Sequence, residues 1–393
     1  MKFYRESLRL QPTAGFFSKY AIILTISIAL LSMTNVWAND FEQGWESFNH
    51  GDYTTAFTEW QPLAEQGDAR AQFLLGAMYY DGEGVNQDFD QAAFWYQKSA
   101  DQGTVLAQHA LGVMYENGQG FLRDYDQAIH WHGLAAEKHY VLSEYALGLI
   151  YQNGLGVAQD DQKAVEYFTR AAEQGYAPAQ NNLGLMYYQG NGVIQDYKES
   201  RKWLRLAAKQ EVAEAQFLLG WMYYKGEGIQ PDTRQAAKWF RLAADQGQAK
   251  AQTNLGLMYA KGDGVNKNEE KAFEYFKLAA EQNEGIAQSN LGLMYSQGRV
   301  VAKNHTEAAK WFARAADQGI TSAQDKLGLM YQYGRGVGQD MISAYKWYRL
   351  SASQGHVNAR ERLDIITPKM TPDEIHKAEQ LVEEWYDSRS GDV

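Results

Sequence analysis

The sequence predicts an all-α fold, a right-handed solenoid of about nine antiparallel helix hairpins with a C-terminal capping helix. Two markers recur every 36 residues without a register slip: a Leu-Gly-x-Met/Ile-Tyr segment and an aromatic residue. The first marker begins at Leu75, Leu111, Leu147, Leu183, Leu219, Leu255, Leu291 and Leu327. The second lies at Trp95, Trp131, Tyr167, Trp203, Trp239, Tyr275, Trp311 and Trp347. A fixed period of this length is typical of stacked hairpins that bury their apolar faces only against one another.

Residues 1–38 have the layout of a secretory signal peptide. Basic residues precede an apolar run over 21–33, and Val36-Trp37-Ala38 offers a cleavage-like end. We expect cleavage after Ala38 and a periplasmic or secreted protein with no stable membrane insertion. The alternative is an uncleaved helix over 20–38 that anchors the protein in the inner membrane, facing the periplasm.

Residues 39–67 are expected to form a shortened N-terminal capping hairpin. Ala56 and Gly67 lie 36 residues before their counterparts in the first full repeat. Its first helix is expected over 40–49. Pro62 falls in the second helix, where we expect it to bend the helix or end its regular hydrogen bonding, because proline has no N–H.

Eight full repeats are expected over residues 68–355. In each repeat a helix A places positions such as Ala71 and Leu75 on one face, four residues apart, and a helix B follows with its own apolar face. A Gly-x-Gly turn joins them, and an Asp or Asn near the start of helix B is suited to N-capping. Repeat seven has Gly298 followed by Val300, so we expect its turn to differ.

A glycine recurs inside every helix A, at Gly76 and its seven counterparts. Glycine inside a helix costs about 1 kcal/mol relative to alanine. Because the sequence repeats this cost eight times, we expect a neighbouring helix to approach so closely that no Cβ fits.

Residues 356–393 are expected to form C-terminal capping helices. Ala359 and Leu363 continue the helix A pattern without a helix B. Thr371-Pro372-Asp373-Glu374 then predicts a helix start with a capping box, and the amphipathic helix after it covers the open end of the array.

Composition argues against several classes of function. The net charge is −11 and no Lys/Arg-rich run exists, so nucleic acid is not an expected partner. The sequence contains no cysteine, which excludes disulfides, thiol chemistry and zinc–thiolate sites. We expect no cofactor and no metal.

These repeats resemble the Sel1-like repeat family, relatives of the tetratricopeptide repeats. Ala251–Gly264 and Ala236–Gly247 together carry the whole family pattern, from Ala-Gln and Leu-Gly to Ala-Ala-x-Gln-Gly, and the resemblance covers about residues 40–366. It implies a non-enzymatic adaptor or scaffold. A cysteine-rich bacterial branch is associated with penicillin binding, but this chain lacks that branch's cysteines.

Two patterns could carry chemistry, and both have a simpler explanation. Four histidines fall in or beside repeat two (His109, His130, His132 and His139), but no pair has the spacing of metal ligands on a helix. Ser343-x-x-Lys346 matches a motif of penicillin-recognising enzymes, but the companion motifs are missing. We therefore expect no catalytic residue.

The side of helix A opposite its core face is the expected binding surface. By analogy with tetratricopeptide arrays it lines the concave face, where we expect a protein or peptide from the envelope or the secreted fraction to bind. The candidate partner-binding residues are Phe73, Tyr80, His109, Tyr145, Tyr188, Phe217, Trp221 and Tyr224. Trp221 stands where five sibling repeats carry Leu. The alternatives are packing of these aromatics within the array, a binding module for envelope glycan and, less favoured, a hydrolase.

Overall fold

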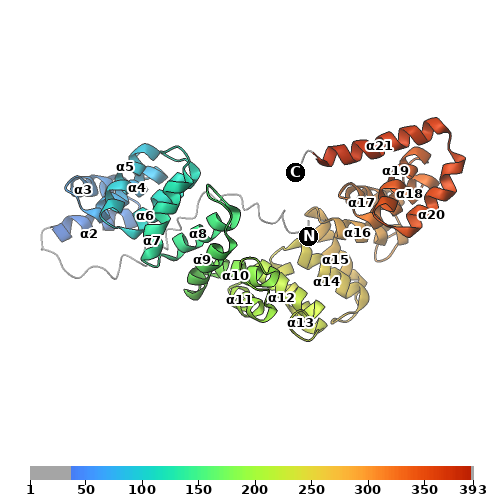
Figure 1. Cartoon of the computed structure of the whole chain (residues 1–393), viewed down its shortest axis with the longest axis horizontal. Coiled ribbons are helices and arrows are strands. Elements are labelled where there is room, and N and C mark those ends of the chain that lie inside the picture. The colour runs from blue at the N-terminus through green and yellow to red at the C-terminus, as the bar shows by residue number, and fades with distance from the viewer. Residues whose placement is uncertain (1–36, 391–393) are drawn as a thin grey trace. The chain divides into compact units, whose positions relative to one another are not determined.

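The computed structural model describes residues 37–390, and in that part every element is helical (Figure 1). The predicted leader, 1–38, lies outside the described residues except for its last two positions. The helices are α2 (Trp37–Asn49), α3 (Tyr53–Glu65), α4 (Ala69–Asp81), α5 (Phe89–Asp101), α6 (Val105–Asn117), α7 (Tyr125–Glu137), α8 (Val141–Asn153), α9 (Asp161–Glu173), α10 (Ala177–Gln189), α11 (Tyr197–Lys209), α12 (Ala213–Lys225), α13 (Thr233–Asp245), α14 (Ala249–Lys261), α15 (Glu269–Glu281), α16 (Gly285–Gln297), α17 (His305–Asp317), α18 (Thr321–Tyr333), α19 (Met341–Ser353), α20 (Val357–Ile366), the 3₁₀ turn η3 (Thr367–Lys369) and α21 (Pro372–Ser390).

The predicted hairpins are confirmed, and their ends are fixed by the residues expected there. In repeat six, helix A (α14) ends at Gly262, whose φ of 79° is left-handed, and Gly262 N–H donates to the Met258 carbonyl. Helix B (α15) begins after Asn268, whose side chain accepts from the Lys271 N–H. Glycine is favoured at the first position because left-handed backbone strains residues with a Cβ.

The prediction for the glycines inside helix A is also confirmed. A Cβ built on Gly220 would lie 2.7 Å from Phe240 Cδ1, and one built on Gly256 would lie 2.8 Å from Phe276 Cε1. In each full repeat the same glycine faces the helix B residue twenty positions later. A helix B side chain, which is a ring in seven repeats and Leu204 in repeat four, therefore packs directly on the backbone of helix A.

The turn of repeat seven differs from the prediction. Val300 adopts a φ of 68°, nearly the same as the 69° of Gly264 at the corresponding place in repeat six. The backbone thus keeps the turn of its siblings, and the β-branched side chain is held in a left-handed conformation that such residues rarely adopt.

Pro62 does not end its helix. α3 continues through Pro62 to Glu65 and ends in the same register as the other B helices. α2 and α3 form the expected N-terminal hairpin around the fully buried Trp60, whose indole N–H donates to the Phe41 carbonyl at 3.2 Å. Within residues 37–390, no helix combines the length and the hydrophobicity needed to span a bilayer.

Pairs of glutamines, one buried on helix A and one exposed at the end of helix B, form a ladder of hydrogen bonds through most repeats. In repeat six, Gln282 Nε2 donates to Gln252 Oε1 at 2.9 Å, and Gln252 Nε2 donates to the Ala244 carbonyl of the preceding helix at 3.2 Å. Each such pair satisfies buried polar groups at a helix end. We call this feature the glutamine ladder.

The glutamine ladder changes in repeats two and three. Lys138 replaces the donor glutamine of repeat two and binds the Gly103 carbonyl, which leaves Gln108 Oε1 without a partner among the described residues. In repeat three Glu144 replaces the acceptor and takes bonds from Gln174 (2.5 Å) and Arg170 (2.9 Å). The chain divides into two compact units between Ser143 and Glu144.

The C-terminal cap forms as predicted. Thr371 N–H donates to Glu374 Oε2 at 2.8 Å and Glu374 N–H donates to Thr371 Oγ1 at 3.3 Å, which is a complete capping box. α21 buries Ala378 and Val382 and packs on α19, and it extends to Ser390. Apolar surface at this end of the second unit is thereby covered.

Candidate functional site

Repeat five carries three aromatic side chains on one helix, α12. Phe217, Trp221 and Tyr224 follow one another at intervals of four and three residues, so they lie on one face. All three are half-buried in the structure. We call these three residues the aromatic surface.

Each member of the aromatic surface has different surroundings. Phe217 packs on Phe240, with ring centroids 5.7 Å apart. Trp221 contacts the apolar cores on both sides of α12, its ring centroid lies 6.3 Å from that of Tyr224, and Lys225 Nζ lies 4.9 Å above it. Trp221 is thus fixed by packing and partly open to solvent, as binding anchors commonly are.

The Tyr224 hydroxyl differs from that of its counterparts. Tyr80 donates to Gln119 at 2.9 Å and Tyr188 donates to Glu227 at 2.7 Å, in each case a residue 39 positions later in the next turn. Asp263 is the residue at that distance from Tyr224, and no such bond forms within the described residues. Instead a small hollow of about 30 Å³, large enough to admit water, lies beside Tyr224 and Asp263.

Two of the predicted partner-binding residues belong to the core. Phe73 is only 5 % exposed and packs on Tyr96, with ring centroids 5.6 Å apart. His109 is only 7 % exposed. Phe73 is thus covered by helix B of its own repeat, and His109 by its own helix B and the start of the next repeat, so neither side chain is available to a partner.

The remaining predicted residues are held by neighbours. Tyr145 packs between Phe168 and Tyr176, and burial raises its pKa to about 12. Tyr80 and Tyr188 are half-buried, and their hydroxyls donate hydrogen bonds to Gln119 and Glu227 respectively. The structure brings together Phe217, Trp221 and Tyr224, and it distributes the others over separate repeats.

The histidines of repeat two do not assemble a metal site. Ser143 Oγ lies 2.9 Å from His109 Nδ1 and 3.1 Å from His132 Nδ1, and His132 Nε2 lies 3.1 Å from Glu116 Oε1. His130 is exposed on the other side of α7. Among residues 37–390 no group of three or more His, Asp or Glu side chains could hold a metal. Since Ser143 is fully buried, this network joins neighbouring helices and offers no nucleophile to a substrate.

The Ser343-x-x-Lys346 motif also has a structural use. Ser343 Oγ donates to Asp340 Oδ2 at 2.6 Å, at the N-terminus of α19. Lys346 Nζ lies 4.6 Å above the Trp347 ring, and burial lowers its pKa. The two side chains serve a helix cap and a ring contact.

A second hollow, which the sequence reasoning did not identify, lies between repeats five and six. It measures about 730 Å³ and is lined by Arg234, Arg241, Tyr259, Lys267, Lys271 and the turn that joins α14 to α15. The sequence does carry a signal for this hollow, because four positions at this junction are basic and the equivalent positions of the other junctions are less so. The signal emerges only when equivalent positions of different repeats are compared, and not when residues are compared along one helix.

The family model for the Sel1 repeat matches eight consecutive segments, 69–104, 105–140, 141–176, 177–212, 213–248, 249–284, 285–320 and 321–356. The chain belongs to the Sel1 repeat family. The Sel1 repeat solenoid is a fold generally used for protein–protein interaction, and proteins built from it are generally non-enzymatic scaffolds.

Solved Sel1 repeat structures agree with this assignment. The protein c5321 of uropathogenic Escherichia coli, a protective antigen with the same kind of repeat, is 32% identical, with a TM-score of 0.62 over 89% of this chain and 84% of that one. A Sel1 repeat protein from Oxalobacter formigenes is 32% identical, with a TM-score of 0.63 over 79% of this chain and 89% of that one. A search of curated proteins gave no match.

Proposed function

We propose that this Sel1 repeat protein is a non-enzymatic adaptor of the bacterial cell envelope that binds another protein or peptide through the aromatic surface of repeat five. The observation that carries this proposal is Trp221. The Trp221 side chain packs on two apolar cores but remains partly exposed to solvent. Five sibling repeats have the smaller Leu at this position. A rigid aromatic side chain loses little entropy on binding and fills a partner's pocket well.

Polar groups beside Trp221 support the same proposal. The Tyr224 hydroxyl makes no hydrogen bond within the described residues, and Asp263 and Lys261 line the hollow next to it. A partner can therefore combine apolar contact with the indole and hydrogen bonds at the hollow. This combination of a buried anchor and a polar rim is typical of protein interfaces.

Trp221→Leu tests the proposal. The variant is expected to fold, because Leu257 and Leu293 occupy the same position in the next two repeats. Its affinity for a partner captured from envelope extract should fall about thirty-fold, which corresponds to about 2 kcal/mol. Affinity is measured by titration with the purified partner, and the melting temperature is measured on the same variant.

Phe94→Leu is the matched control. Phe94 is an aromatic residue of α5 that is 49 % exposed and lies outside the aromatic surface, so its loss should leave affinity unchanged. A lower melting temperature with unchanged affinity for Trp221→Leu would assign Trp221 to the core. Purified peptidoglycan serves as a second probe, and binding to it in place of protein would contradict the proposal.

The envelope location rests on the leader. We propose export and cleavage after Ala38. The cut would remove the first two residues of α2 and spare Phe41, which packs in the core against Trp60. N-terminal sequencing of the exported protein should give Asn39 first. Recovery of the protein in the cytoplasm, or with Met1 retained, would contradict this part of the proposal.

A further inference from the structure

The hollow between repeats five and six is lined by several basic side chains, although the chain is acidic overall. We call it the cationic hollow. Its wall contains Arg234 and Arg241 of α13, Lys267 of the turn and Lys271 of α15, and it contains no carboxylate. The whole sequence carries a net charge of −11. A local concentration of positive charge on such a surface attracts an anionic partner selectively.

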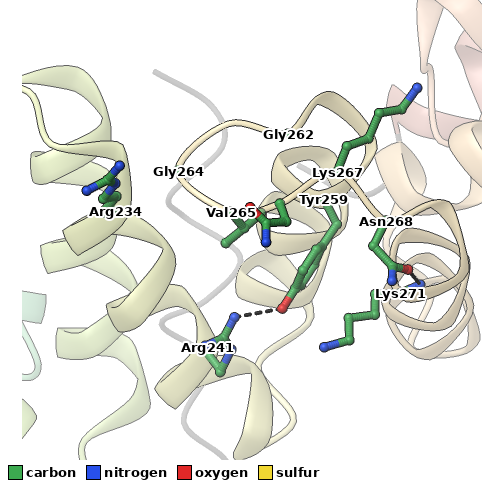
Figure 2. Close-up of a pocket in the computed structure, with 10 residues that line it drawn as sticks. Arg234, Arg241, Tyr259, Gly262, Gly264, Val265, Lys267, Asn268 and Lys271 are labelled. Carbon is green, nitrogen blue, oxygen red and sulfur yellow. Dashed lines mark hydrogen bonds between the residues drawn. The ribbon is translucent and has the colours of Figure 1, made fainter.

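The side chains at the centre of the hollow are held in place. Arg241 Nη2 donates to the Tyr259 hydroxyl at 2.7 Å, and Lys271 Nζ lies 5.3 Å from the centroid of the same ring (Figure 2). Tyr259 is only 6 % exposed and is stacked on Tyr275, with ring centroids 5.9 Å apart. A buried ring thus positions a guanidinium and an ammonium that come from two different helices.

Three of the four cations in the hollow have no ion pair within the described residues, and Lys267 is the exception. Lys267 forms an ion pair with Glu269 at 3.2 Å and leads away from Tyr259 in Figure 2. In the part of the chain that the structure describes, Arg234, Arg241 and Lys271 form no ion pair. Three cations therefore remain for a ligand.

The repeats themselves provide a comparison. Seven junctions between consecutive repeats have the four positions that Arg234, Arg241, Lys267 and Lys271 occupy here, and every other junction carries at most two cations there. The junction of repeats three and four has Gln162, Thr169, Gln195 and Glu199 at these positions. Since all junctions form the same turn and helices, folding does not require this set of cations.

We infer that the hollow binds an acidic peptide segment through its carboxylates. The hollow is wide and its cations are spread, with Arg234 near Gly264 and Arg241 and Lys271 near Tyr259 (Figure 2). Carboxylates spaced along a chain match this spread, whereas a single compact oxyanion needs donors that converge on one point. The apolar wall at Val265 contacts the chain between the carboxylates.

The position of the hollow links it to the aromatic surface. The turn that joins α14 to α15 borders both hollows: Gly262 and Gly264 line the cationic one, and Asp263 lines the small one beside Tyr224. One extended segment can therefore reach from the aromatic surface to the cations. This inference rests on the proposed function for the identity of its occupant, because the acidic segment belongs to the same partner.

The test is a titration with fluorescein-labelled hexaglutamate at low ionic strength. The full chain should bind it, and added salt should weaken binding because the charges are exposed to solvent. Arg241→Gln combined with Lys271→Gln should weaken binding about tenfold or more. Gln97 and Gln127 occupy these positions at the first junction, so the variant is expected to fold, which its helical circular dichroism verifies.

Lys377→Glu is the matched control. It changes the net charge by the same amount, and Lys377 is exposed on α21, which packs on α19 of repeat eight and does not line the hollow. Hexaglutamate binding should change less than about twofold, because a charge two repeats away acts on the peptide only over a long, screened distance. An equal loss in both variants would overturn the inference. Failure of the parent chain to bind hexaglutamate would also overturn it. So would pyrophosphate binding that is tighter than hexaglutamate binding in the parent and is lost in the double variant.

Failure of this inference is separable from failure of the proposed function. Trp221→Leu should leave hexaglutamate binding intact, since Trp221 does not line the cationic hollow. Suppose that the envelope partner binds the double variant as tightly as the parent, while Trp221→Leu lowers the partner's affinity. The inference that the hollow binds an acidic segment is then wrong, and the proposed role of the aromatic surface is retained. If hexaglutamate binds as expected but Trp221→Leu leaves the partner's affinity unchanged, the proposed function is the part that fails.

Discussion

Single residues show which turn positions tolerate a side chain. His139, Glu211 and Asn283 adopt left-handed backbone at the end of helix B, where a Cβ built on sibling glycines such as Gly175 and Gly247 meets nothing within 4 Å. Val300 is left-handed at the place where a Cβ on its counterpart Gly264 would collide with the Thr233 carbonyl. The Val300 side chain itself is 45 % exposed, so its strain lies in the backbone conformation.

Val300→Gly should therefore stabilise the protein. A left-handed residue with a Cβ costs about 1–2 kcal/mol, and part of that gain is offset by the greater freedom of glycine in the unfolded chain. We expect the free energy of unfolding to rise by about 1 kcal/mol, measured by denaturant titration. The reverse change, Gly264→Val, should lower it, and a neutral or negative result for Val300→Gly would show that the turn is not strained.

His109 makes stability depend on pH. Burial, aided by the neighbouring His132, lowers the pKa of His109 well below 6.5, so this side chain stays neutral in the folded protein while the unfolded chain takes up a proton. Its contribution is fully present above about pH 6.5 and is lost as the pH falls below that value. Ser143 and Tyr140 also contact the ring, and neither offers a compensating negative charge.

His109→Phe should flatten this dependence. Phe73 and Phe217 occupy the same position in sibling repeats, so a phenyl ring fits the fold. Between pH 7 and 5 the free energy of unfolding of the parent should fall more steeply, by up to about 1.4 kcal/mol per pH unit, than that of the variant. His130→Phe, at an exposed position, is the control, and equal slopes in all three proteins would contradict the assignment.

At the scale of elements, the last helices are joined by a buried charge. Asp325 of α18 is 1 % exposed and binds Arg362 of α20, with Lys326 Nζ at 3.7 Å and His356 Nδ1 at 3.9 Å. A carboxylate that loses its main partner in such a place is strongly destabilising. The ion pair therefore holds the cap against the final repeat.

Arg362→Leu should lower the free energy of unfolding by about 3 kcal/mol. Adding Asp325→Asn should recover most of it, because Asn181 occupies this position in repeat four and asparagine carries no charge. Thermal denaturation of the single and double variants checks the prediction. A double variant no more stable than Arg362→Leu would mean that the unpaired Asp325 carboxylate is not the cause of the loss.

Elements and ends were predictable because they depend on local chemistry. The 36-residue period, the glycine at each turn and the Thr371 capping box specify where helices begin and end without reference to the rest of the chain. Which side of helix A a neighbour covers is a tertiary property. For that reason Phe73 and His109 were assigned to a binding surface although the structure buries them.

The cationic hollow was missed for a related reason. Arg241 and Lys271 come from consecutive repeats and lie thirty positions apart, so no window along one helix places them together. Val300 shows the opposite error. Its side chain indicated a new turn, but the backbone keeps the φ of the sibling glycines.

At the scale of the molecule, a repeat is a removable unit. Helices contact mainly their neighbours along the chain, and each repeat begins and ends in the same register. Deleting 176–211 should leave a soluble helical protein with a lower melting temperature, because one set of neighbour interfaces is lost. Deleting 176–193 should instead give an aggregating chain, since it leaves α11 without its helix A. Equal behaviour of the two deletions in circular dichroism and gel filtration would contradict this view.

The altered rungs of the glutamine ladder have a consequence for the gene. Repeat two carries Gln108 and Lys138 at the two positions of the glutamine pair, without a bond between them, and repeat three carries Glu144 bonded to Gln174, so each has one residue that departs from the glutamine pair. Recombination between the two coding segments, at the turn, would join Gln108 to Gln174 and Glu144 to Lys138. The first product carries the ordinary amide pair and the second a carboxylate facing an ammonium. Crossing-over at this point thus gives each recombinant gene one hybrid repeat with complementary side chains at the two positions of the glutamine pair. The array can therefore shorten or lengthen by one repeat without adding a mismatched pair.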